Sequence, residues 1–183
     1  MSKSPYLIKT QRLGLRPWHQ DDLAPFAALN QDPEVMRYFP SMPDRAETWA
    51  SMERQMVHQT RHGFCFWAAD LLATGEFIGF IGLSTPRFET DFTPCVEIGW
   101  RLDKAYWGQG LAPEGATACL DYARATLHIP EVYSFTPVSN HPSERVMQKI
   151  GMQKIGTFLH PLIEEGHSLQ EHLLYYINMR PPV

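Results

Sequence analysis

A glycine-bounded loop, residues 106–113, carries the clearest chemical signal in the sequence. It reads Tyr-Trp-Gly-Gln-Gly-Leu-Ala-Pro and lies between a predicted strand at 95–102 and a predicted helix that opens at Pro113. The first N–H groups of a helix have no partner within the helix and lie at the positive end of its dipole. The loop and the helix start therefore predict a site for a phosphate or pyrophosphate.

Two common phosphate-binding loops do not match this segment. A Walker loop requires G-x-x-x-x-G-K-[ST], and the chain contains no such string. In the Rossmann pattern G-x-G-x-x-G, Gly108 and Gly110 fit, but Pro113 stands in the place of the third glycine. The sequence therefore disfavours an ATPase or GTPase, and also an oxidoreductase that binds NAD or FAD.

The elements around the loop predict a mixed α/β fold. Strands at 64–71, 77–84 and 95–102 follow one another as an antiparallel meander. The other predicted elements are a strand at 6–18, helices at 21–31 and 44–61, a turn at 35–39, a helix from 113 to about 127, a strand at 131–138, a helix at 140–150 and strands at 153–161 and 170–179. One parallel crossover passes through the glycine loop, and ligands gather at the carboxyl ends of such strands.

Two of these predictions concern particular segments. Asp44 and Glu47 form a capping-box pattern at the start of the long helix, and Ala46, Trp49, Met52 and Met56 recur at helical spacing as its expected core face. The two prolines and the polar residues of 85–94 predict a loop, which is a candidate for lining a substrate site.

The length and the charge of the chain limit the classes of function that it can have. A chain of 183 residues fits a single domain, 1–183, and a net charge of -4 without a Lys/Arg cluster argues against a nucleic-acid binder. No apolar run reaches the roughly 18 residues that a membrane span needs, and the first residues lack a secretory signal, so we expect a cytoplasmic protein. His58 and His62 share a helix face without the glutamate of a zinc motif, so no metal site is expected.

The chain closely resembles the GCN5-related N-acetyltransferase (GNAT) superfamily, in particular its RimJ/RimL-like branch. The segments that carry the resemblance are 96–102 (VEIGWRL), 106–114 (YWGQGLAPE), an N-x-x-S motif from Asn140 to Ser143, a K-x-G motif from Lys149 to Gly151, the strand 9–16 and the hairpin 160–167. The family loop often begins with glutamine or arginine, and Ala105 takes that position here. The resemblance implies a mostly antiparallel sheet of about six to seven strands, flanked by about four helices.

The resemblance also implies acetyl-CoA as the co-substrate and assigns residues to it. Backbone N–H groups would hold the pyrophosphate, namely those of Gly108, Gln109, Gly110, Leu111 and Ala112. The strand end at Trp100, Arg101 and Leu102 would bond the pantetheine amides as an added strand does. Asn140 would contact the pantetheine arm or cap its own helix, and both roles can hold at once.

The implied chemistry is direct attack of a neutral primary amine on the thioester. Glu97 is the candidate base, with a structural ion pair or a solvated position as the alternative. Ser143 is the candidate proton donor to the departing thiolate, with a bond to its own helix as the alternative. Positioning alone can supply roughly 7–11 kcal/mol of the barrier, so the loss of either side chain could cost little.

The acceptor stays open at this stage. The branch resemblance suggests a protein N-terminus, and a small amine such as an amino acid, a polyamine or an antibiotic fits equally well. The main alternative function is a catalytically silent module that binds acetyl-CoA as a sensor or scaffold. The sequence also leaves open a homodimer and the use of a longer acyl group.

Overall fold

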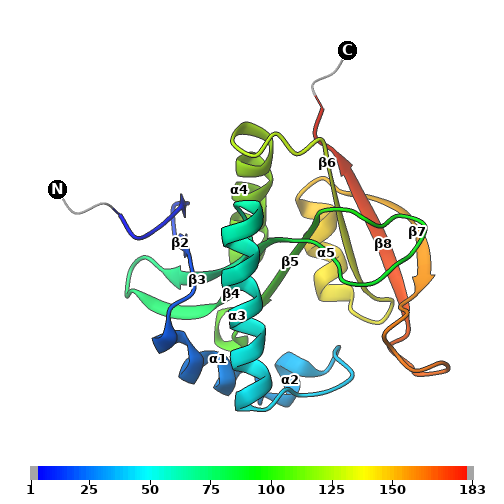
Figure 1. Cartoon of the computed structure of the whole chain (residues 1–183), viewed down its shortest axis with the longest axis horizontal. Coiled ribbons are helices and arrows are strands. Elements are labelled where there is room, and N and C mark those ends of the chain that lie inside the picture. Colours follow the sequence, from blue (N-terminus) through cyan, green and yellow to red (C-terminus); the bar gives the residue numbers. More distant parts are fainter. Residues whose placement is uncertain (1–3, 181–183) are drawn as a thin grey trace.

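The computed structural model describes residues 4–180, and its strands form one mixed sheet in the order β1-β2-β3-β4-β5-β6-β8-β7 (Figure 1). The strands are β1 Ile8–Lys9, β2 Leu13–Arg16, β3 Phe66–Leu71, β4 Glu76–Ser84, β5 Glu97–Leu102, β6 Glu131–Pro137, β7 Gln153–Leu159 and β8 Glu171–Asn178. Neighbouring strands are antiparallel except for β5 and β6. The mixed, mostly antiparallel sheet and the meander β3–β4–β5 were both predicted.

The single strand predicted at 6–18 is wrong, because this segment forms the hairpin β1–β2. The hydroxyl oxygen of Thr10 accepts hydrogen bonds from the N–H groups of Leu13 (2.9 Å) and Arg12 (3.3 Å), and this turn reverses the chain. The hairpin is the main reason why the sheet formed by residues 4–180 has eight strands rather than six or seven.

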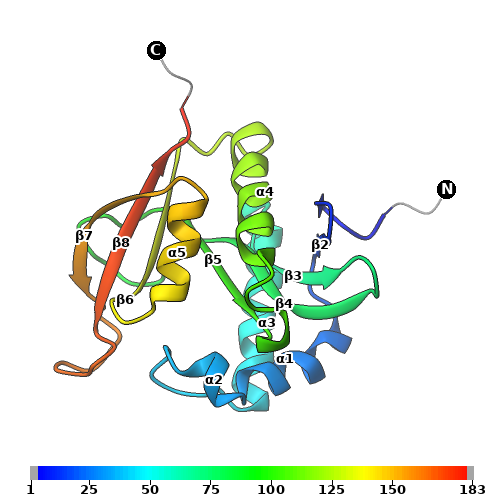
Figure 2. The same cartoon turned by 180° about the vertical axis from the view of Figure 1, so that it is seen from behind.

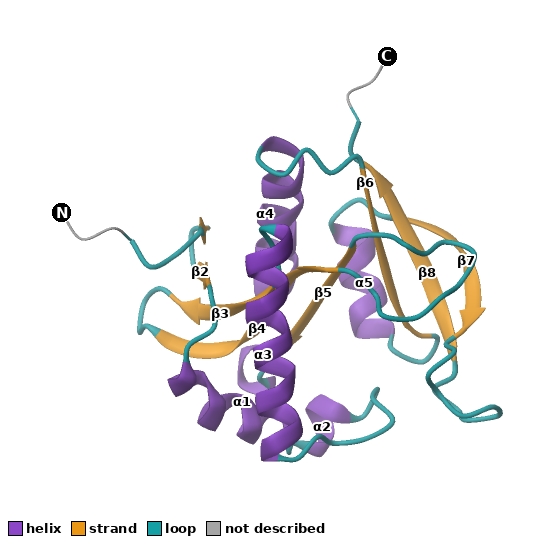
Figure 3. Cartoon of the chain, viewed as in Figure 1, coloured by secondary structure: helices purple, strands orange, loops and turns teal. Residues whose placement is uncertain are grey.

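The sheet is covered by helices on both faces (Figures 1, 2 and 3). The helices are α1 Leu23–Asn30, α2 Pro33–Met36, α3 Arg45–His62, α4 Leu111–Ala125 and α5 His141–Lys149, with short 3-10 turns at Gln20–Asp22 and Lys104–Tyr106. The two views place α1 and α3 on one face, and α4 and α5 on the other. Residues 4–180 contain five helices where about four were predicted, because the short helix α2 forms at Pro33–Met36 where the sequence predicted only a turn at 35–39.

The capping box of α3 is confirmed, and one of its predicted core residues is wrong. The carboxylate of Asp44 accepts the N–H of Glu47, and the carboxylate of Glu47 accepts the N–H of Asp44, both at 2.8 Å. Met52 is fully buried, whereas Ala46 is exposed and Thr48 is buried in its place. Ala46 lies in the first turn, before the helix reaches the sheet, so its side chain has no surface to cover.

Strands β5 and β6 separate almost as soon as they meet. Their parallel pairing consists of Glu97 opposite Tyr133, supported by a bond from the N–H of Tyr133 to the oxygen of Val96 at 2.9 Å. A second bond joins the Ser134 hydroxyl to the oxygen of Ile98 at 3.0 Å. Beyond that point the facing edge of β5 is not paired with β6, which leaves main-chain groups of β5 available to a ligand.

Candidate active site

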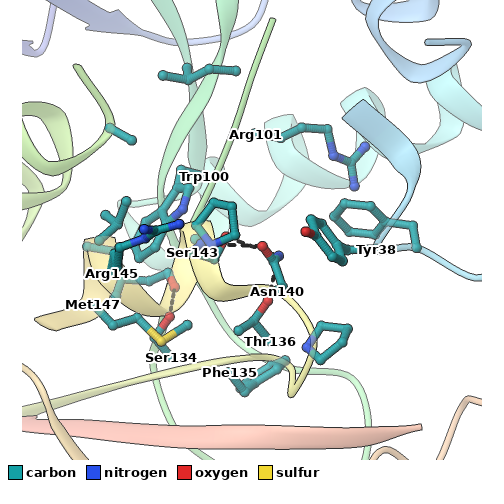
Figure 4. A pocket seen from close by; sticks show the side chains of 18 of the residues that line it. Tyr38, Trp100, Arg101, Ser134, Phe135, Thr136, Asn140, Ser143, Arg145 and Met147 are labelled. Carbon is teal, nitrogen blue, oxygen red and sulfur yellow. Dashed lines mark hydrogen bonds between the residues drawn. The ribbon is translucent and has the colours of Figure 1, made fainter. Parts of the chain in front are cut away.

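A pocket of about 850 Å³ lies where β5 and β6 diverge (Figure 4). Its size is within the range of natural ligand sites. It brings together ten of the eleven predicted site residues, namely Glu97, Trp100, Arg101, Leu102, Gly108, Gly110, Leu111, Ala112, Asn140 and Ser143. The exception is Gln109, whose side-chain amide donates instead to the oxygen of Ala105 at 3.1 Å.

Two predictions about the outline of the site need correction. Helix α4 begins at Leu111, two residues before the predicted start at Pro113. Proline in the first helical turn needs no N–H partner, so Pro113 does not set the boundary. The loop 85–94 contributes no lining residue; its Phe88 and Phe92 pack instead on aromatic rings of β6 and β7.

The backbone of the glycine loop has the form that an anion requires. Gly108 and Gly110 have φ angles of +72° and +77°, which residues other than glycine rarely adopt. Within residues 4–180, no acceptor is bonded to the N–H groups of residues 108–112, whereas the N–H of Trp107 bonds Lys104. These free donors at the start of α4 fit a pyrophosphate.

A brace that the sequence did not reveal holds this loop. The Arg12 guanidinium donates to the oxygen of Gln109 at 2.9 Å and forms an ion pair with Glu114 at 2.6 Å. The other carboxylate oxygen of Glu114 accepts the Thr10 hydroxyl at 2.6 Å. The turn of the β1–β2 hairpin is thereby fixed to the first turn of α4. In the sequence, the only sign of this contact is the acidic Glu114 in the first turn of a predicted helix, and such a residue is usually explained by the helix dipole.

Glu97 lies in the pocket without an ion pair within the described residues. Burial raises the pKa of its carboxyl from 4.5 to about 7. The structural ion pair considered from the sequence is therefore absent from this part of the chain. A carboxyl with a pKa near neutrality can accept and release a proton under working conditions.

Asn140 and Ser143 are linked to each other at the start of α5 (Figure 4). The Asn140 side-chain oxygen accepts the N–H of Ser143 at 3.3 Å, so Asn140 caps the helix. Its amide nitrogen donates to the hydroxyl oxygens of Thr136 at 2.8 Å and Ser143 at 3.1 Å. Because the Ser143 hydroxyl accepts this bond, its own proton is free for another acceptor in the pocket.

The side chains at the end of β5 lie on opposite sides of the pocket. Trp100 and Arg145 lie together on one side of the pocket in Figure 4, whereas Arg101 lies with Tyr38 on the other. The Leu102 oxygen accepts the Trp107 indole N–H at 2.8 Å, so one lone pair of this carbonyl is already used. The main chain of Arg101 is directed toward Phe80 of β4, because the bond from the Asp103 N–H to the Ile78 oxygen sets the alternation of the β4–β5 ladder. Of the predicted pantetheine-binding segment, Trp100 therefore keeps the least committed main chain.

A family model for the acetyltransferase (GNAT) domain matches residues 12–153. The chain belongs to the GNAT acetyltransferase family. Two relatives are each 33% identical to this GNAT domain: the uncharacterized protein YkkB of Bacillus subtilis (79% of this chain, 84% of the relative) and the FsC-acetyl coenzyme A-N(2)-transacetylase of Aspergillus fumigatus (90% and 74%). The chain is accordingly an acyltransferase that uses acetyl-CoA.

Solved structures agree with this GNAT fold. A GNAT-family acetyltransferase from Bacillus anthracis is 25% identical and superposes with a TM-score of 0.78 over 94% of this chain and 98% of its own. RimJ from Mycobacterium smegmatis, solved with a CoA disulfide, gives 0.72 over 91% and 81%. At 19% identity RimJ supports the fold alone, so the RimJ/RimL-like branch stays a prediction.

Residues 4–180 of the GNAT enzyme contain neither a metal-binding cluster nor a membrane-spanning helix. No group of three or more metal-binding side chains occurs there, and no helix in that range is long and apolar enough to cross a bilayer. His58 and His62 do share a face, with ring centroids 4.4 Å apart. His58 bonds the oxygen of Phe64 at 2.8 Å, which gives it a structural role.

Proposed function

We propose that this enzyme transfers the acetyl group directly from acetyl-CoA to a primary amine, with Glu97 as base and Ser143 as acid. The observation that carries the proposal is that the free N–H groups of the glycine loop, a carboxyl with a raised pKa and a serine hydroxyl with a free proton line one pocket. The whole chain, 1–183, would form one such domain.

Glu97 and Ser143 would each carry out one proton transfer in the proposed reaction. The amine nitrogen forms a bond to the acetyl carbon and the carbon–sulfur bond breaks. The Glu97 carboxylate accepts the proton that the amine loses, directly or through water. The Ser143 hydroxyl gives a proton to the departing sulfur and regains one from solvent. Asn140 keeps the serine oxygen in place through the 3.1 Å bond.

Binding would be divided between the two sides of the pocket. The loop N–H groups of residues 108–112 would hold the pyrophosphate, and the free edge of β5 at Trp100 would bond the pantetheine amides. The acceptor would enter from the opposite side, which is lined by the segment 35–40 next to α2 and by His160 and Leu162 of the β7–β8 connection. The name of the Aspergillus relative, an N(2)-transacetylase, supports a nitrogen acceptor.

The test is release of free thiol from acetyl-CoA, read with a disulfide dye, against a panel of small amines and N-terminal peptides. We expect release with at least one amine and a rate that increases with pH through about 7. A silent sensor would instead be stabilised by acetyl-CoA through mass action and would release no thiol with any amine. That second result would refute the catalytic proposal.

A further inference from the structure

Arg101 on β5 is a buried cation without a carboxylate partner. In the described residues, the only hydrogen bond of its side chain runs from Nη1 to the Asn30 side-chain oxygen at 2.6 Å, and its Nε is enclosed without any partner. Two aromatic rings flank the guanidinium, Phe39 at 4.0 Å and Phe80 at 5.4 Å. These contacts hold the cation in place, but none of them neutralises it.

The same chain treats another buried arginine differently. Arg16 forms ion pairs with two buried carboxylates, Asp22 at 2.8 Å and Asp70 at 2.6 Å. That arrangement is what a structural buried arginine needs, because an unpaired buried charge is costly. Arg101 lacks it, although burial lowers the pKa of its guanidinium to about 10 and the group stays charged at neutral pH.

The neighbours of Arg101 are themselves fixed. Asn30 is 1% exposed and donates through its amide nitrogen to the Thr48 hydroxyl at 3.1 Å, which orients its oxygen toward Arg101. Arg101 also lines the pocket, on the side of Tyr38 and away from Trp100 (Figure 4). The other arginines and the lysine of the lining are exposed and screened by water, namely Arg37, Arg145 and Lys149.

Given the transferase function proposed above, we infer that the acceptor is an amine that also bears a carboxylate, and that Arg101 binds this carboxylate. Arginine and carboxylate form strong charge-assisted bonds. Glu97 and Arg101 lie on the same face of β5, four residues apart, which corresponds to roughly 13 Å between their Cα atoms. Both side chains shorten this span, so the acid and the amine of the acceptor are separated by several bonds, as in a short peptide or a long-chain amino acid.

The experiment compares matched acceptors on the wild type, Arg101→Met and the control Arg45→Met. The probes are 6-aminohexanoate with its amide, and alanyl-alanine with its amide; each pair differs in one negative charge. We expect wild-type kcat/KM to favour the acid over the amide by about 10-fold or more, and Arg101→Met to reduce that preference by about 10- to 100-fold. Arg45→Met should keep the preference, because Arg45 is exposed and lies outside the pocket.

A second readout separates this inference from the proposed function. Thermal shifts of the CoA complex by the same probes measure binding without turnover. If no amine of the panel described above releases thiol but the acids still stabilise wild type more than Arg101→Met, the transferase proposal fails and the carboxylate site stands. An acid-to-amide ratio near one in both readouts would overturn the site. So would a weaker affinity of Arg101→Met for acetyl-CoA with an unchanged acid preference.

Discussion

Replacing Glu97 with glutamine should make the protein more stable and less active, and the gain in stability should depend on pH. Burial raises the pKa of Glu97 from 4.5 to about 7. The folded state therefore favours the protonated carboxyl. This preference contributes its full stability below pH 4.5, the value expected for the unfolded chain, and is lost as the pH rises through about 7. Glutamine does not ionise and avoids that loss.

The size of the stability change follows from the difference between the two pKa values of Glu97, 4.5 and about 7. This difference corresponds to about 3 kcal/mol when the carboxyl is fully ionised. Water that enters the pocket reduces this to about 1–2 kcal/mol. For a chain of 183 residues, that difference corresponds to a rise in Tm of about 2–8 °C.

The assay is thermal unfolding without ligand at pH 5 and at pH 8.5, with Glu171→Gln as a control because Glu171 is an exposed glutamate at the start of β8. Glu97→Gln should unfold at a higher temperature than wild type at pH 8.5 and at nearly the same temperature at pH 5. The rise of wild-type kcat/KM with an apparent pKa near 7 should be missing in the variant. An equal Tm difference at both pH values, together with identical pH–rate profiles, would refute the reasoning.

Two further predictions concern the other parts of the site. Ser143→Ala should lower kcat by about 10- to 100-fold in steady-state kinetics, because the proton donor is lost. The KM for acetyl-CoA should stay within about threefold, because the glycine loop is intact. An unchanged kcat would show that positioning of the reactants alone is enough for catalysis. Arg12→Met removes the ion pair to Glu114 and the bond to the Gln109 oxygen, so the Kd of acetyl-CoA should rise by about 5- to 20-fold in calorimetry. Lys9→Met, an exposed change on the same hairpin, is the control. Equal affinities of the two variants for acetyl-CoA would show that the Arg12 contacts do not support binding.

The sequence was most informative where neighbouring residues determine the structure. The capping box at Asp44 and Glu47, the strand meander and the glycine loop each depend on short-range patterns, and all three were predicted. The motif from Asn140 to Ser143 likewise placed both residues in one pocket, although their mutual hydrogen bond needed the structure.

The features that were missed depend on residues distant in sequence. The pair Arg12 and Glu114 is 102 residues apart, and Arg101 meets Asn30 across 71 residues. No local pattern marks such a contact, because either arginine could equally lie on a solvated strand face. The hairpin β1–β2 was missed for a different reason: its turn is stabilised by the Thr10 hydroxyl, without glycine or proline at its corner.

The central claim is that the glycine loop binds the CoA pyrophosphate, and calorimetry with two ligands tests it most directly. Acetyl-CoA contains the pyrophosphate and acetyl-pantetheine lacks it. Gly110→Glu should weaken acetyl-CoA binding by about 100-fold or more and leave acetyl-pantetheine binding unchanged. Gly166→Glu is the matched control, since its φ of +81° imposes the same backbone strain away from the pocket. Wild-type affinity of Gly110→Glu for acetyl-CoA would contradict the account.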